Sequence, residues 1–178
     1  MLNRYRIRKI VFDHTDKAIQ HWKENIYIHG KTSIHMVKGY FMVENQQEIL
    51  DRAYDKGFEY ERKYGYCSQA VLSAIQDIFG GIDDKVIQAS HSLAGGGSLD
   101  GDGTCGGYGG AMMAISAFFG RKRDQFGQGD VADWMDSSKL SRKVREKFID
   151  EYGSIICNDI QKKCLENRLC RNPHLNNY

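Results

Sequence analysis

Apolar residues recur at spacings of three and four along most of the chain, which predicts amphipathic helices. The pattern starts at Gln46 and is interrupted by glycines, which are expected to terminate helices. No alternating run of apolar and polar residues is long enough to predict a strand, and no heptad or internal repeat occurs. We therefore expect an all-α fold, a compact bundle of about five or six helices with glycine-rich loops. The predicted segments are residues 46–64, 67–79, 83–94, 105–119, 138–152 and 158–165.

Two of these segments carry predictions about particular residues. Asp83 or Asp84 is expected to cap the third helix, because a short acidic side chain accepts a hydrogen bond from the first turn. Residues 121–133 are predicted to be a polar connection between the fourth and fifth helices. The residues expected to face the core are Val86, Ile87 and Leu93 in the third helix, and Leu140, Val144 and Phe148 in the fifth.

The composition is typical of a soluble globular domain. The chain has 178 residues, of which 41% are apolar and 27% charged, enough to bury a sizeable core. The formal net charge of +2 argues against a nucleic-acid binder held by bulk charge. The apolar run at residues 111–119 is far shorter than the roughly 20 residues of a spanning helix, so we expect no membrane insertion. Without a signal-peptide pattern we expect a cytoplasmic protein, where free or metal-bound thiols are favoured over structural disulfides.

The first part of the chain differs from the rest in charge. Residues 1–38 hold eight Lys or Arg, three Asp or Glu, and four of the six histidines. The histidine spacing fits no standard metal-binding pattern. We therefore expect a basic arm at residues 1–43, disordered or weakly helical, then a helical domain at residues 44–163 and an atypical tail at residues 164–178.

An alternative interpretation is that this basic arm is not native. The codons AAA-GGA for Lys38 and Gly39 would place a purine-rich ribosome-binding sequence just before a start at Met42. Both interpretations of the arm stay open at this point.

Glycine is abundant, with 19 residues against one proline. One glycine-rich run, residues 101–106, matches the G-x-G-x-x-G pattern, but no buried strand precedes it, so we reject a dinucleotide site. Two aspartates in the same loop suggest calcium binding, yet the remaining ligands of a calcium loop are absent. Glycine permits close backbone approach, so Gly106, Gly107, Gly109 and Gly110 are expected to press against another helix or a cofactor.

Three of the five cysteines share one local setting. Cys67, Cys105 and Cys157 each follow a glycine break and each starts, or nearly starts, a predicted helix. A helix N-terminus offers unpaired N–H groups and a partial positive charge, which favour a thiolate over a thiol. Thiolates bind metals, attack disulfides and react with oxidants. The alternative is that these cysteines pack in the core as small apolar groups.

The cysteine spacing excludes several kinds of site. No C-x-x-C, C-x-x-C-H or compact ferredoxin run is present, so any shared site must form from distant helix starts. Cys164 follows Cys157 by seven residues, about 10 Å along a helix, which is too far for a disulfide between them. Cys170 lies beyond the last predicted helix and could fold back.

Other residues near the cysteines are expected to have structural roles. Tyrosines at positions 64, 66, 108 and 152 are predicted to pack in the core, and His91 to be a helix residue with a hydrogen-bond partner. No Ser-His-Asp pattern, paired-carboxylate motif or phosphate loop supports a hydrolase.

Several separate motifs occur in order, at residues 64–72, 93–96, 101–110, 119–121 and 151–157. Together they resemble the redox-active family named for its cysteine pattern C-GCAxxG-C-C, and the similarity covers roughly residues 46–163. The resemblance implies a small helical protein with four cysteines in a redox role. Similar modules accompany multihaem cytochromes of the split-Soret type, where an iron–sulfur site is the suggested use, and members often lie near transporter genes.

By position, Cys67, Cys105 and Cys157 match the first three cysteines of that family. Gly107 stands where the pattern usually has alanine. The family's fourth cysteine usually lies a few tens of residues past the third, but this chain ends 21 residues after Cys157. Either Cys164 or Cys170 substitutes, or the tail is a truncated or frame-shifted remnant.

Three hypotheses follow. The leading one is an iron–sulfur cluster, [2Fe–2S] in the simplest case, for electron transfer, with metal ligands Cys67, Cys105, Cys157 and Cys170. In this hypothesis the backbone at Gly106 and Gly107 is cofactor-binding, through N–H···S bonds. The second is a metal-free dithiol/disulfide redox protein. The third is a zinc-stabilised or metal-free binding module. The redox partner is unidentified, enzymatic activity is left open, and an incomplete ligand set would favour a homodimer.

Overall fold

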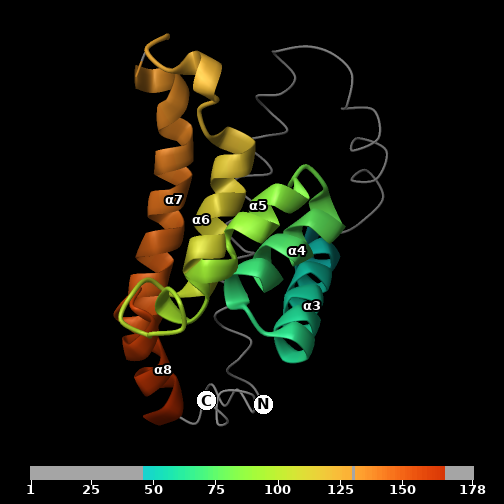
Figure 1. Cartoon of the computed structure of the whole chain (residues 1–178), viewed down its shortest axis with the longest axis vertical. Coiled ribbons are helices and arrows are strands. Elements are labelled where there is room, and N and C mark those ends of the chain that lie inside the picture. Colours follow the sequence, from blue (N-terminus) through green and yellow to red (C-terminus); the bar gives the residue numbers. More distant parts are fainter. Residues whose placement is uncertain (1–45, 130, 167–178) are drawn as a thin grey trace.

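The computed structural model describes residues 46–129 and 131–166 (Figure 1). Within these ranges the fold is all-α, as predicted, with six α-helices and two short 3₁₀ helices. The single β-type contact in the same ranges is an isolated antiparallel bridge between Thr104 and Ile156. The elements are α3 Gln46–Tyr64, α4 Cys67–Phe79, α5 Asp84–Ala89, η1 His91–Gly96, α6 Gly106–Phe119, η2 Arg123–Gln125, α7 Val131–Tyr152 and α8 Cys157–Glu166.

The helices pack in a simple order. α4 lies against α3 on one side and α6 on the other, and α6 also packs on α7. Figure 1 shows α3, α4 and α5 grouped on one side of α6 and the long α7 on the other side. α8 lies beyond the C-terminal end of α7. α6 therefore lies between two groups of helices, and its sequence is apolar on more than one face, as this position requires.

The core lies where α4, α6 and α7 meet. Leu72 and Ile75 of α4 are almost completely buried, and so are Val144 and Phe148 of α7. Burying such side chains contributes about 1.5–3 kcal/mol each. The predicted core residues of the fifth helix are thus confirmed, because Leu140 is buried with the other two.

Small residues let α4 and α6 approach closely. A methyl group on Gly110 would lie 2.7 Å from the carbonyl oxygen of Ser68 and 3.2 Å from its Cα. Ala111 and Ala114 are buried on the same helix. The prediction that glycines at the start of α6 press against another helix is confirmed at Gly110.

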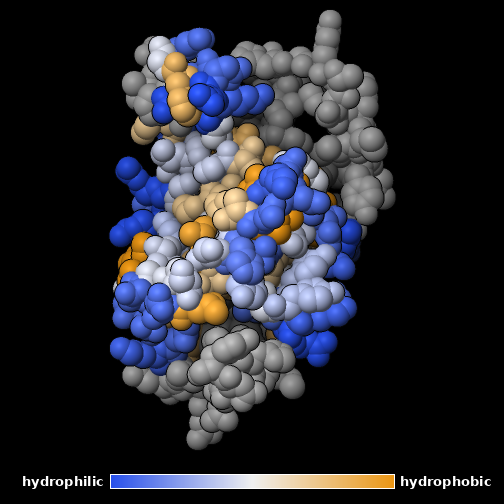
Figure 2. Space-filling view, in the orientation of Figure 1, coloured by the Kyte–Doolittle hydropathy of each residue, from blue (hydrophilic) through white to orange (hydrophobic). Residues whose placement is uncertain are grey.

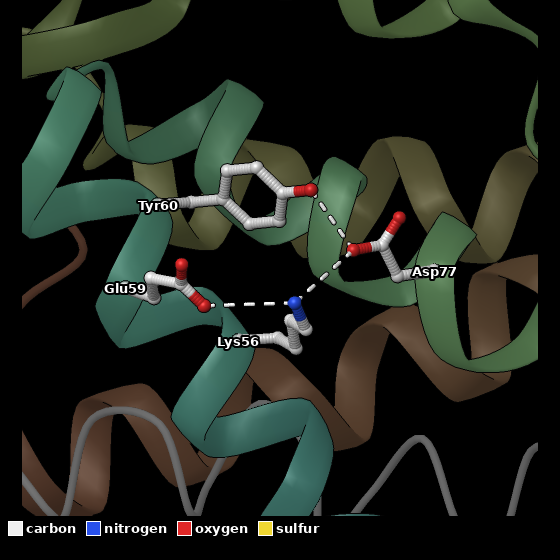
Figure 3. Close-up of polar contacts among 4 residues, drawn as sticks. All are labelled: Lys56, Glu59, Tyr60 and Asp77. Carbon is white, nitrogen blue, oxygen red and sulfur yellow. Dashed lines mark hydrogen bonds and ion pairs between the residues drawn. The ribbon is translucent and has the colours of Figure 1, made fainter.

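A polar contact ties α3 to α4 at the surface (Figure 3). The hydroxyl of Tyr60 donates to Asp77 at 2.9 Å, and the ammonium of Lys56 lies 4.0 Å from the same carboxylate. Lys56 also pairs with Glu59 at 3.5 Å. Because these groups are exposed, each ion pair contributes about 0–1 kcal/mol, so burial rather than charge holds the two helices together.

The third predicted helix is only partly correct. Asp83 is its N-cap, as expected, and accepts from the Lys85 N–H, but the α-helix ends at Ala89. A 3₁₀ helix follows, and Leu93 is 40% exposed instead of buried. At this junction Ser90 is buried, and its carbonyl accepts from the Ser68 hydroxyl at 2.8 Å and from the Leu93 N–H at 3.0 Å. Val86 and Ile87 pack partly against the core.

The fifth helix starts earlier than predicted. α7 begins at Val131, inside the segment expected to be a polar connection, which also contains the short η2. After Gly129 no glycine or proline occurs until Gly153, so nothing in the sequence stops the helix from extending towards its N-terminus.

Apolar side chains reach the surface over α6 and α5, with hydrophilic residues beside them (Figure 2). In the described ranges no helix combines the length and apolarity needed to cross a membrane. The predicted arm at residues 1–43, with its four histidines, and Cys170 in the tail lie outside the described residues.

Candidate functional site

Three free cysteines stand at three helix starts. Cys67 is the first residue of α4, Cys105 immediately precedes α6, and Cys157 is the first residue of α8. The sequence prediction that these residues begin helices is therefore confirmed. We call Cys67, Cys105 and Cys157 the three-thiol site.

The isolated bridge brings Cys105 and Cys157 to one place. The N–H of Cys105 donates to the carbonyl of Ile155 at 2.8 Å, and the N–H of Cys157 donates to the carbonyl of Gly103 at 2.9 Å. Each cysteine directly follows a bridge residue in its own segment. Because side chains alternate along paired segments, both cysteines leave the pair on the face opposite the bridge residues.

Cys67 joins the site through the packing of α4 on α6. A methyl group on Gly106 would overlap the sulfur of Cys67 and would lie 2.9 Å from the carbonyl oxygen of Leu93. Residue 106 must therefore be glycine for Cys67 to lie where it does. By contrast, a methyl group on Gly107 meets only the Cys105 sulfur, at an ordinary contact distance of 3.8 Å.

The turn before Cys67 is conformationally unusual. Gly65 and Tyr66 both adopt left-handed backbone angles, with φ of 68° and 56°. A left-handed conformation costs roughly 1–2 kcal/mol in a residue with a side chain. Tyr66 stacks on the ring of His91, with centroids 4.1 Å apart, so the turn is fixed by a contact across to η1. The turn sets the direction in which α4, and with it Cys67, enters the site.

Glycines also surround Cys157. A methyl group on Gly96 would lie 2.9 Å from the Cβ of Cys157 and 2.8 Å from the Cα of Gly101. One on Gly103 would overlap the carbonyl oxygen of Gly96. The glycine-rich loops are thus explained by the close approach of three chain segments around one cysteine.

An N–H group acts on each sulfur. The backbone of Gly95 lowers the pKa of Cys67, and the backbones of Gly107 and Tyr108 lower the pKa of Cys105. For Cys157 the donor is a side chain: the amide of Gln161 lies 3.0 Å from the sulfur.

Burial nevertheless dominates the acidity of these thiols. It raises the pKa of Cys67 to about 12 and also raises the pKa of Cys105 and of Cys157. The sequence-based expectation that helix N-termini favour the thiolates is therefore wrong for the metal-free site. Desolvation of the charged form outweighs the N–H groups, which act in the opposite direction.

Glu61 is a residue of the site that sequence reasoning missed. It lies in the last turn of α3, and one of its carboxylate oxygens is buried. Its charge raises the pKa of all three thiols, so it lies close enough to act on the whole site. Its only signal in the sequence is its position one turn before the break that precedes Cys67. Gln161 was also missed, although its place four residues after Cys157 on a helix indicates a contact.

Cys164 does not supply a fourth free thiol. It is buried in the core face of α8 and is disulfide-bonded. The preference for free thiols is thus confirmed for three cysteines and wrong for this one. Cys157 is free, so the prediction that it does not pair with Cys164 is also confirmed.

The aromatic predictions are correct for half of the tyrosines. Tyr152 is buried and Tyr108 packs against the core, both beside the ring of Phe148. Tyr64 and Tyr66 are instead 62% and 38% exposed, because they flank the turn between two helices. His91 has its predicted partner, the Gln69 side chain at 3.1 Å.

The residue types at the site are those that hold a thiolate-bound cofactor. The charge of Glu61 acts on all three thiols, and at each sulfur an N–H group lowers the pKa, which favours negative sulfur. Over the part of the chain that the structure describes, no three His, Cys, Asp or Glu side chains are arranged to bind a single metal ion.

The fold and the site define an all-α protein organised around three convergent thiols. The chain belongs to the C_GCAxxG_C_C family, described as "Putative redox-active protein (C_GCAxxG_C_C)", whose sequence model matches residues 65–175, well over half of the chain. The match includes the three-thiol site and both Cys164 and Cys170. No curated protein and no solved structure matches the chain.

Proposed function

We propose that the three-thiol site is the redox centre of this protein and that its sulfurs are ligands of an iron–sulfur cluster used for electron transfer. The observation that carries the proposal is the convergence of three helix-start cysteines with an N–H donor on each sulfur. Such clusters are held by cysteine thiolates, and hydrogen bonds to the sulfurs tune their potentials.

The acidity of the thiols supports a bound cation. With a raised pKa, each thiol is protonated near neutral pH, and a protonated thiol is a poor nucleophile. A metal ion deprotonates the thiols that bind it and offsets the charge of Glu61 nearby. The site is therefore better suited to thiolates whose charge is balanced by a bound metal ion than to thiols that ionise without one.

The bridge geometry also favours a cluster over a disulfide between Cys105 and Cys157. Each residue lies diagonally across the pair from the other, a relationship that separates backbone positions by about 7–8 Å. Disulfides usually need Cα atoms closer than roughly 7 Å. A cluster of several atoms can join sulfurs that do not touch.

In this proposal the protein's own groups have distinct tasks. Cys67, Cys105 and Cys157 hold the cluster. Cys170, within the family match, is the fourth ligand once the disulfide at Cys164 is reduced, because the other three cysteines of the chain are free. The backbone at Gly107 favours negative charge on the Cys105 sulfur, and Gly106 allows Cys67 to approach. When bound, the cluster supplies a one-electron carrier. The partner is a one-electron redox protein. Cys157 is buried, whereas Cys67 and Cys105 are half-buried.

A second candidate is a metal-free dithiol protein that uses Cys67 and Cys105. Its support is that Cys67 lies against Gly106, the residue next to Cys105, and that the charges of the two sulfurs act on each other. In that case two thiols would be lost and regained reversibly.

Anaerobic purification of the full chain, with absorption spectra and analysis of iron, sulfide and zinc, tests both candidates. We expect brown protein with near-equal iron and sulfide, lost in Cys67→Ser, Cys105→Ser, Cys157→Ser and Cys170→Ser. Thr104→Ser, at an exposed side chain beside Cys105, is the matched control and should keep the cluster.

Colourless protein after reconstitution would overturn the cluster proposal. Reversible loss of two thiols in that sample would support the dithiol candidate, and one tightly held, redox-silent zinc would support a binding module. If only Cys170→Ser keeps the cluster, the ligand set is incomplete in one chain, and the molecular mass in solution then tests a dimer.

A further inference from the structure

The three sulfurs differ in what donates to them. The groups that act on Cys67 and Cys105 belong to the backbone, namely Gly95 for Cys67 and Gly107 and Tyr108, in the first turn of α6, for Cys105. Cys157 accepts from the side-chain amide of Gln161, with Nε2 3.0 Å from Sγ. Cys157 is also almost fully buried, with 5% of its surface exposed. Of the three sulfurs, the one of Cys157 thus has a side-chain donor, which a substitution of Gln161 would remove.

The geometry of this contact is set by the helix. Gln161 follows Cys157 by four residues on α8, so the two side chains lie on the same face, one turn apart. A partly exposed glutamine can bond to water instead, yet this amide points to the sulfur.

Other contacts hold α8 in place without Gln161. The N–H of Asn158 donates to the carbonyl of Gly101 at 2.8 Å, and Lys163 donates to the carbonyl of Glu151 at 2.9 Å. Ile160 is buried in the core. Removal of the Gln161 amide should therefore leave the position of α8 unchanged.

We infer that Gln161 is a positioning residue of the three-thiol site, which orients the Cys157 sulfur and stabilises negative charge on it. For the loaded protein this inference rests on the function proposed above. The hydrogen bond itself is a feature of the metal-free chain, so its effect on the sulfur can also be measured there.

The first test is the reduction potential of the loaded protein, followed by absorption during titration with dithionite as electron donor. Gln161→Met keeps the length of the side chain but removes the N–H, so the reduced, more negative state loses stabilisation and the potential should fall. Gln161→Lys places a cation near the sulfur and should raise the potential. Gln128→Met, the same substitution in the exposed loop before α7, should leave it unchanged.

The second test needs no cluster. In the metal-free protein, alkylation of Cys157 relative to Cys105 by iodoacetamide is measured by peptide mass spectrometry at one pH. A hydrogen bond to a charged group is worth about 1.5–3 kcal/mol, so Gln161→Met should slow the alkylation of Cys157 by about 10- to 150-fold. Unchanged circular dichroism would show that the fold is intact.

The two tests separate the inference from the proposed function. If the wild type binds no cluster but Gln161→Met slows the alkylation of Cys157, the inference stands and the cluster proposal fails. If the cluster forms and neither the potential nor the alkylation rate changes in Gln161→Met, the inference is wrong and the cluster proposal stands.

Discussion

The sulfur of Cys67 lies directly against the Cα of Gly106, where the N-termini of α4 and α6 meet. A methyl group on the neighbouring Gly107 would meet only the Cys105 sulfur, at an ordinary contact distance. A side chain is therefore excluded at residue 106 but fits at residue 107, so the same substitution at the two positions gives a matched pair of variants.

Gly106→Ala should damage the site, whereas Gly107→Ala should not. The new methyl at residue 106 would collide with the Cys67 sulfur and crowd the Leu93 carbonyl, which we expect to destabilise the fold by about 1–3 kcal/mol. At residue 107 the methyl fits, and alanine in a helix is worth up to about 1 kcal/mol over glycine. Urea unfolding of both variants measures this difference, and equal stabilities would contradict the assigned packing.

Glu61→Gln should make Cys67 more acidic. The Glu61 carboxylate raises the pKa of this thiol by disfavouring the thiolate, so its neutral replacement should lower that pKa from its value of about 12. The pH profile of Cys67 alkylation in the metal-free protein should then shift to lower pH. Glu59→Gln, on the same helix but paired with Lys56 at the surface, is the control. A profile that moves as much in the control would rule out a specific effect of Glu61.

The metal-free protein should lose stability in alkali. The pKa of Cys67 in the folded chain, about 12, is above the 9.0 of an ordinary thiol. The unfolded chain therefore releases this proton first, and the stabilisation is complete below pH 9.0 and is lost as the pH rises towards 12. The slope should be up to about 1.4 kcal/mol per pH unit. The difference between wild type and Cys67→Ala in urea unfolding at several pH values isolates this thiol, and parallel curves would contradict the prediction.

Much of the fold could be predicted because local signals agree with the packing. The bounds of α4 follow directly from glycines on either side of an apolar periodic run, and Leu140, Val144 and Phe148 face the core as their spacing requires. The prediction for the third helix was wrong at its C-terminal end, where a tertiary contact lies. The hydroxyl of Ser68 binds the carbonyl of Ser90, and no local pattern indicates that contact.

The candidate site was predictable in its cysteines but not in their environment. Three glycine–cysteine breaks pointed to helix starts, and the structure brings those starts together. The acidity of the thiols was predicted with the wrong sign, because the sequence shows the helix N-terminus but not the burial that outweighs it. Glu61 precedes the turn at Gly65 and Tyr66, whose left-handed backbone is not apparent from composition.

Loss of packing in the core next to the three-thiol site should weaken the site. Phe148 is fully buried, and its ring makes a T-shaped contact with Tyr108, with centroids 5.2 Å apart. The backbone of Tyr108 lowers the pKa of Cys105. Phe148→Ala should cost about 3–5 kcal/mol and lower the retention of any group bound by Cys105. Phe126→Ala is the control, since that ring is 58% exposed and a surface change usually costs within about 0.5 kcal/mol. Urea unfolding and metal analysis measure both effects, and similar losses in the two variants would show that Phe148 does not support the site.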